Sequence, residues 1–219
     1  MESRRPSAAA ALLPLLLAAS LACARAAPPP KPPCYSPLNP DFETLCYTTV
    51  AQEGAFSLRD YAQGVDAAVV DSFGLTLSEA AQFVLTYFTG KNGAGAQVAR
   101  TVPVFFRPIV DADGFIAING SMPLPTSVYP NPALAPSPQS PNNGPLESFP
   151  TARFAAITFE TVDYPAVLDY AFKCGELGEE MDRRGLKPVV AGRFNQTWAT
   201  YSLVAAATKV SECLIEVQV

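Results

Sequence analysis

The chain has 219 residues, no histidine and a formal net charge of −5. This length is enough for one sizeable domain or for a compact domain built from two repeats. An acidic chain without a basic stripe lacks the electrostatic footprint of a nucleic-acid-binding protein. Because histidine is absent, catalytic triads built on it and metal sites ligated by it are excluded.

Residues 1–26 have the pattern of a secretory signal peptide. Arg4 and Arg5 form a basic end, residues 8–22 form an apolar core, and Ala24-Arg25-Ala26 or the overlapping Ala22-Cys23-Ala24 offers a small-residue cleavage site. The alternative, a membrane anchor, needs a longer apolar run than these roughly 15 residues. We therefore expect entry into the secretory pathway, an extracellular or vacuolar destination, and no stable membrane insertion after the signal is removed.

The cysteine count fits secretion. Removal of the signal leaves four cysteines, Cys34, Cys46, Cys174 and Cys213. Four cysteines allow three pairings. We favour Cys34–Cys46 with Cys174–Cys213, and the alternative is four buried thiols.

Two glycosylation sequons point the same way. They are Asn119-Gly-Ser and Asn195-Gln-Thr, and they are usable only in the secretory pathway.

The first part of the mature chain changes from proline-rich to strand-like. Residues 27–44 predict an extended leader, and residues 45–219 the folded domain. Strand character follows at residues 45–49, 56–61 and 65–70.

The next stretch predicts a helix followed by a strand. Residues 77–89 carry two apolar rows at helical spacing, which makes a wide apolar face. Ser78 is the expected cap, and Gly90 ends the helix. Residues 98–107 alternate as a strand, in which Pro103 indicates an edge or a bulge.

The remaining segments repeat this plan. Residues 111–114 predict a turn and 115–122 a strand, and a proline-rich loop at 123–150 separates the two halves. The second half reads as a strand at 153–161, a helix at 165–184, strand character at 189–191 together with 197–204, and a strand at 212–217. In the second helix we expect an inward face made of the apolar side chains Val167, Leu168, Ala171, Phe172, Leu177 and Met181. Gly175 and Gly178 favour a kink there.

One part of the sequence resembles a known family, the SOUL or heme-binding protein family. The run that carries the resemblance holds Tyr87, Gly90, Asn92, Thr101, Pro103 and Val104. Arg100 stands where the family has a methionine. Residues 56–61 and Glu212 near the C-terminus look like two further family strands, so the resemblance covers about residues 46–219.

The resemblance implies an α+β fold. Two strand-helix-strand-strand repeats would close one pseudo-two-fold barrel, with a helix packed on each side. It also implies a heme or related tetrapyrrole lying in an apolar cleft against the first helix. The expected wall consists of Ala80, Phe83, Val84 and Tyr87, and the expected propionate partners are Lys91 and Arg100. The alternative for the apolar residues is that they form core.

The chemistry available to this site is limited. Without histidine, a heme iron would need Tyr, Met or Cys as its ligand, with Tyr87 the nearest candidate. We favour a porphyrin held without a protein–iron bond, in a non-catalytic carrier, buffer or scavenger. One alternative is a secreted glycosylated interaction domain that has lost its ligand. Another is a small-molecule hydrolase that uses Glu212 with Tyr61 or Tyr201 as an acid–base pair.

Overall fold

The computed structural model describes residues 34–72, 76–110, 116–139, 146–149, 151–189, 196–202 and 208–219. The predicted signal peptide, the turn at residues 111–114 and the sequon at Asn195 lie outside these ranges.

The described chain alternates strands with two α-helices. In order, the elements are β1 (Cys34–Ser36), β2 (Asn39–Thr44), β3 (Tyr47–Glu53), β4 (Phe56–Tyr61), β5 (Gly64–Ser72), α1 (Leu77–Phe88), β6 (Val104–Val110), β7 (Ile116–Pro123), the 3-10 helix η1 (Pro132–Leu134), β8 (Glu147–Phe149), β9 (Ala152–Thr161), α2 (Val167–Arg183), β10 (Gln196–Thr200) and β11 (Lys209–Glu216).

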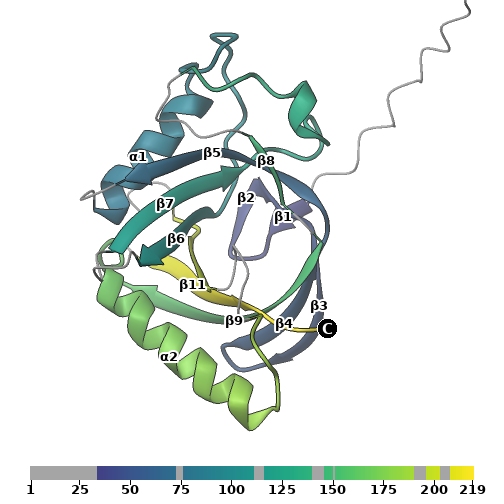
Figure 1. The fold of residues 1–219 in the computed structure, drawn as a ribbon, viewed down its shortest axis with the longest axis vertical. Coiled ribbons are helices and arrows are strands. Elements are labelled where there is room, and N and C mark those ends of the chain that lie inside the picture. Colours follow the sequence, from purple (N-terminus) through teal and green to yellow (C-terminus); the bar gives the residue numbers. More distant parts are fainter. Residues whose placement is uncertain are drawn as a thin grey trace, which may run out of the picture.

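Nine strands form one curled sheet in the order β3-β4-β9-β11-β10-β6-β7-β5-β8. Its ladders are antiparallel. The edge strands β3 and β8 are not paired with each other in the described part of the chain, although the sheet bends into a ring in Figure 1. The mixed α and β content matches the expected class, but a closed barrel is not formed, because closure requires a ladder between the two edges.

The sheet contains two units of the same strand order. In β5-α1-β6-β7 the third strand lies between the first and the second, and in β9-α2-β10-β11 it does so again. The two units join through the antiparallel pair β6 and β10. The strand-helix-strand-strand plan expected from the sequence is therefore present in each half.

Both helices pack on the outer side of the sheet (Figure 1). Helix α1 lies on β7 and β5, and α2 lies on β11 and β9. At Gly120 of β7 an added Cβ would meet Val84 Cγ2 at 3.2 Å and Ala80 Cβ at 3.7 Å. A glycine therefore allows α1 to approach the sheet closely.

The start of α1 differs from the expectation. The N-cap is Thr76 and not Ser78: its side chain accepts a hydrogen bond from the backbone of Glu79, and the Glu79 carboxylate accepts one from the backbone of Thr76. This reciprocal capping box satisfies two of the free N–H groups at a helix start.

The buried face of α2 also differs from the expectation. Tyr170, Cys174, Leu177 and Met181 are buried, whereas Leu168 is 66% exposed and Phe172 is 71% exposed. A disulfide between Cys174 and Cys213, with a Cα–Cα distance of 5.4 Å, ties this buried face to β11. Because this covalent link fixes the rotation of the helix, Leu168 and Phe172 face the solvent. The helix is continuous, so the predicted kink is absent.

Strand β6 is shorter than the predicted strand at residues 98–107. It begins at Val104, directly after a cis Val102–Pro103 bond. Before it, the amide of Val102 donates to the carbonyl of Glu43, at 2.9 Å, and that of Val98 donates to Phe88. Proline cannot donate to a ladder, and the preceding amides are used by other segments.

The expected leader is partly folded. Residues 34–44 form the hairpin of β1 and β2, and Cys34 is joined to Cys46 with a Cα–Cα distance of 5.2 Å. Both favoured disulfides are therefore present. The proline-rich loop at residues 123–150 likewise contains η1 and β8.

Candidate functional site

The inner side of the curled sheet carries a buried ion pair. Arg59 of β4 donates to both carboxylate oxygens of Glu212 on β11, at 2.8 and 2.6 Å. The hydroxyls of Tyr201 and Thr158 donate to the same carboxylate, each at 2.7 Å. The Tyr47 ring lies beside the Arg59 guanidinium at 4.7 Å. These partners come from separate strands because alternate residues of each strand point to this side.

The electrostatics of this cluster favour fixed protonation states. Burial alone would lower the pKa of Arg59, but the Glu212 carboxylate outweighs burial and raises it. Burial, followed by the nearby Glu212 charge, raises the pKa of Tyr201. A carboxylate has about four lone-pair positions, and here four donors fill them. The structure thus brings together the Glu212 and Tyr201 pair that the sequence considered for catalysis, but no acceptor position is left for a substrate proton.

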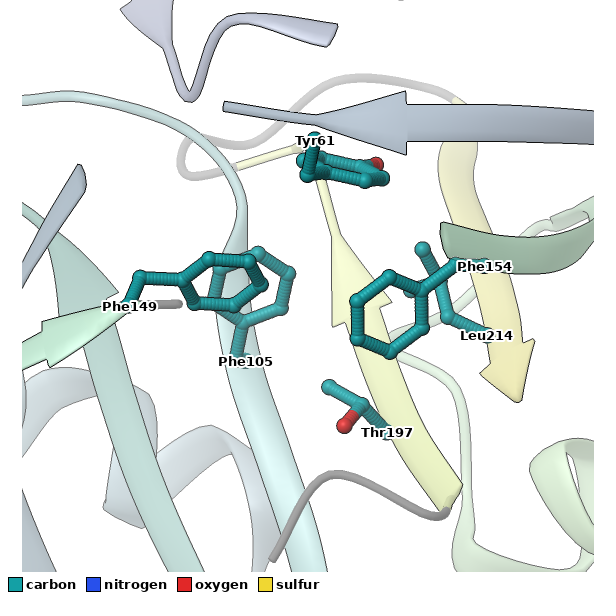
Figure 2. Close-up of a pocket in the computed structure, with 6 residues that line it drawn as sticks. All are labelled: Tyr61, Phe105, Phe149, Phe154, Thr197 and Leu214. Atoms are coloured by element: carbon teal, nitrogen blue, oxygen red, sulfur yellow. The ribbon is translucent and has the colours of Figure 1, made fainter. Parts of the chain in front are cut away.

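The rest of the inner side is an apolar cluster, which we call the concave cluster. Its buried members are Leu45, Tyr61, Val102, Phe105, Phe149, Phe154, Ala156, Ala199, Tyr201 and Leu214. Figure 2 shows the small cavity within it, lined by Tyr61, Phe105, Phe149, Phe154, Thr197 and Leu214. The cavity volume is about 10 Å³, which is room for about one water molecule. In this conformation the concave cluster has no space for a larger ligand.

The predicted tetrapyrrole wall lies mostly in the core under α1. Ala80 and Val84 are fully buried against Gly120. Tyr87 is also buried, and its hydroxyl donates to the carbonyl of Pro136 at 2.6 Å. Burial raises the pKa of Tyr87 to about 12, so this side chain stays a phenol rather than the phenolate that binds iron.

The other three predicted site residues are more accessible. Phe83 is half-buried, and Lys91 and Arg100 are exposed. None of the six predicted residues lines the three pockets described in this section, all of which are formed by described residues.

A pocket does lie against the first turn of α1. Its lining consists of Thr76, Leu77, Ser78, Tyr164, Pro165, Ala166 and Val167, and its volume is about 310 Å³. We call it the helix-start pocket, because it lies between the N-terminal ends of α1 and α2. Equivalent positions of the two units therefore form its two sides.

Tyr164 is the side chain in this pocket with a reactive polar group. Among the described residues its hydroxyl has no hydrogen-bond partner, and it is shielded from solvent. Burial raises the pKa of Tyr164. The side chain is therefore a neutral phenol.

Residues 164–167, which line this pocket, were not considered as part of a site from the sequence. A signal was present in the chain. Thr76 with Glu79 marks the start of one helix, and Pro165 marks the approach to the other. If the two halves are treated as equivalent, the two starts fall at the same place in each unit.

A larger surface groove lies between α2 and the turn from β3 to β4. Its volume is about 450 Å³, but charged side chains dominate its lining: Glu53, Glu176, Glu179, Glu180, Arg183 and Arg184. Several of these charges already form ion pairs, such as Arg184 with Glu53 at 2.7 Å and with Glu180 at 2.5 Å. This groove is a poor match for an apolar ligand.

The chain is similar to a family of known proteins and to solved structures. A model of the SOUL heme-binding protein family matches residues 42–215, and the chain belongs to this family. A crystal structure of a hydrolase from Listeria innocua is similar at 10% sequence identity, with a TM-score of 0.47, over 77% of this chain and 94% of that one. A comparison with curated proteins finds no match.

Proposed function

We propose that the protein binds heme or a related tetrapyrrole at the helix-start pocket, as a non-catalytic carrier, buffer or scavenger. The proposed class of ligand rests on membership of the SOUL heme-binding protein family. The apolar side chains Leu77, Pro165 and Val167 support the location, because a macrocycle binds mainly through its flat apolar faces.

The size of the pocket bears on the affinity. A volume of about 310 Å³ is at the low end of the range for small-molecule sites, about 300–1,000 Å³. The pocket therefore encloses part of a macrocycle and leaves the rest in solvent. Such partial burial suits reversible loading and release.

The residues present fit a macrocycle better than an iron ligand set. The chain has no histidine, and the described residues contain no group of three or more Cys, Asp or Glu side chains able to hold a metal. Tyr164 is the tyrosine in the lining of this pocket, and its raised pKa opposes the phenolate form that would bind iron. We infer recognition of the macrocycle without a protein–iron bond.

The test is a parallel titration of the mature protein, expressed in an oxidising host, with hemin and with protoporphyrin IX. Binding is measured by Soret absorbance and by quenching of Trp198 fluorescence. The expected result is saturable binding of both ligands with similar affinity. Binding of hemin alone would mean an iron ligand and contradict the proposed mode. Binding of neither would leave a glycosylated interaction domain as the better reading.

A hydrolase on this scaffold is the weaker candidate. The Glu212 carboxylate is fully buried and accepts hydrogen bonds from Arg59, Tyr201 and Thr158. A general base needs a free lone pair within reach of its substrate. Loss of ester hydrolysis in a folded Glu212→Gln variant would revive this candidate.

We further infer that the protein acts after entry into the secretory pathway, extracellularly or in a vacuole. The two disulfides support an oxidising compartment. Neither helix of the described residues is long and apolar enough to cross a membrane. N-terminal sequencing of protein secreted by a eukaryotic host tests the inference: a start near residue 27 is expected, and retention of residues 1–26 would contradict it.

A further inference from the structure

The hairpin of β1 and β2 lies over the inner side of the curled sheet. In Figure 1 it occupies the centre of the ring of strands. Leu38 in its turn and Phe42 on β2 pack against the concave cluster. The hairpin thus covers aromatic side chains that would otherwise face the open side of the sheet.

Two polar anchors hold the hairpin in this place. The side-chain amide of Asn39 donates to the carbonyl of Tyr201 at 2.8 Å. The Glu43 carboxylate accepts hydrogen bonds from the backbone and the hydroxyl of Ser127, at 3.0 and 2.7 Å, and from Thr126 at 3.1 Å. Both anchors lie on β2, as does the Glu43 carbonyl that accepts from Val102, whereas the turn adds the apolar contact of Leu38.

The hairpin needs its disulfide to stay closed. Strand β1 has three residues, and its register with β2 shifts between Tyr35 and Ser36. An isolated two-stranded ribbon is marginal in water. The Cys34–Cys46 bond joins the two ends of this ribbon across 12 residues, which restricts the conformations available to the open form.

The two disulfides differ in accessibility. Cys34 and Cys46 are half-buried, whereas Cys174 is 6% exposed and Cys213 is fully buried. Thiol–disulfide exchange requires access of a thiolate to one of the sulfurs. A dithiol therefore reaches the hairpin bond before the bond that ties α2 to β11.

We propose that the hairpin is a disulfide-locked plug, and that reduction of Cys34–Cys46 opens the concave cluster as a binding site for flat aromatic molecules. A dithiol reductant attacks one sulfur and forms a mixed disulfide. Its second thiol then displaces the protein sulfur. The protein gains two thiols and the reductant becomes a cyclic disulfide, so two electrons and two protons pass to the protein.

The ligand class follows from the side chains beneath the plug. Tyr61, Phe105, Phe149 and Phe154 surround the small cavity of Figure 2, and their rings already contact one another at centroid distances of 5.5–6.1 Å. Aromatic walls favour stacked or edge-on rings. Leu38 and Phe42 pack against the concave cluster without lining the cavity itself, so their withdrawal would uncover aromatic side chains of the cluster, and Arg59 would remain paired with Glu212.

The experiment treats the mature protein with dithiothreitol and titrates it with the aromatic probe 8-anilinonaphthalene-1-sulfonate. Mass spectrometry after alkylation should show label on Cys34 and Cys46, with Cys174 and Cys213 unlabelled. A saturable, several-fold rise and blue shift of probe emission is expected, together with faster hydrogen exchange of residues 34–46 and retention of the Trp198 band in the near-ultraviolet circular dichroism spectrum.

A variant with Cys34→Ser and Cys46→Ser is the matched control. Without reductant it should bind the probe as the reduced protein does, and reductant should add nothing. The proposal is overturned if selective labelling occurs without a gain in probe binding, or if the gain is accompanied by loss of the near-ultraviolet spectrum, which marks general loosening. If the variant does not fold, probe binding by the reduced and alkylated wild-type protein tests the proposal by itself.

Discussion

Among single residues, Glu212 carries the largest expected effect on stability. Its side chain is fully buried and the paired Arg59 side chain is 7% exposed. Removing one partner of a buried ion pair leaves an unpaired charge and costs about 3–5 kcal/mol. We expect that loss in the free energy of unfolding for Glu212→Gln, measured by urea denaturation.

The matched control for this prediction is the neighbouring pair of Asp60 and Arg153. These side chains are 44% and 29% exposed, at 2.6 Å, and exposed pairs contribute little. Asp60→Asn should therefore change the unfolding midpoint only slightly. Equal effects of the two substitutions would show that the Glu212 network is not the stabilising feature described here.

Asn119 tests the prediction of glycosylation. The residue lies in β7 between Asp71 of β5 and Arg107 of β6, and its side-chain oxygen is shielded from solvent. A glycan on this asparagine would oppose formation of the sheet. In a eukaryotic secretory host, we expect the mass lost on amidase treatment to disappear in Asn195→Gln and to persist in Asn119→Gln. The reverse pattern would contradict the placement of Asn119.

At the scale of secondary structure, the glycines of α2 and β7 predict opposite effects. An added Cβ at Gly175 or Gly178 has no atom within 4 Å, so each change to alanine should stabilise the protein by about 1 kcal/mol. At Gly120 the Cβ would crowd Val84 at 3.2 Å, and Gly120→Ala should destabilise by about 1–3 kcal/mol. Thermal unfolding of the three variants measures both signs. Stabilisation by Gly120→Ala would show that α1 does not pack closely on β7.

The cap of α1 predicts a pH dependence. Hydrogen bonds from the backbone and then the hydroxyl of Thr76 lower the pKa of Glu79. A lowered pKa contributes stability above the unfolded value, about 4.3, and that contribution is lost as the pH falls through the folded value. Glu79→Ala should lower the melting temperature at pH 7, and the difference from wild type should shrink as the pH falls below 4. A difference from wild type that stays the same below pH 4 would contradict this role of the Glu79 carboxylate.

The elements with a strong local sequence pattern were predicted most accurately. Residues 56–61 form a strand with the expected bounds, and α1 ends one residue before the expected Thr89, because alternation and helical spacing were both strong there. The face of α2 was predicted correctly at Leu177 and Met181, which are buried, and wrongly at Leu168 and Phe172, which are exposed. Leu168 and Phe172 compete with Tyr170 and Cys174 for the sheet, and only the long-range disulfide to Cys213 decides between them.

At the scale of the whole molecule, two features were beyond local patterns. In the part of the chain that the structure describes, the sheet curls without pairing β3 to β8. The hairpin of residues 34–44 lies on its inner side, although its proline-rich surroundings suggested an extended leader. The candidate site depended on the relation between the two units. The helix-start pocket combines residues 76–78 with residues 164–167, whereas the tetrapyrrole wall expected from the resemblance consisted of α1 residues alone.

The measurement that tests the central claim most directly compares protoporphyrin IX binding in two variants with the same charge change. Val167 lines the helix-start pocket, and the neighbouring Leu168 is 66% exposed and lies outside its lining. We expect Val167→Glu to weaken binding at least tenfold, which corresponds to about 1.4 kcal/mol, and Leu168→Glu to leave it unchanged. Unchanged binding in Val167→Glu, with binding lost when Lys91 and Arg100 are replaced by alanine, would contradict this account and return the ligand to the far end of α1.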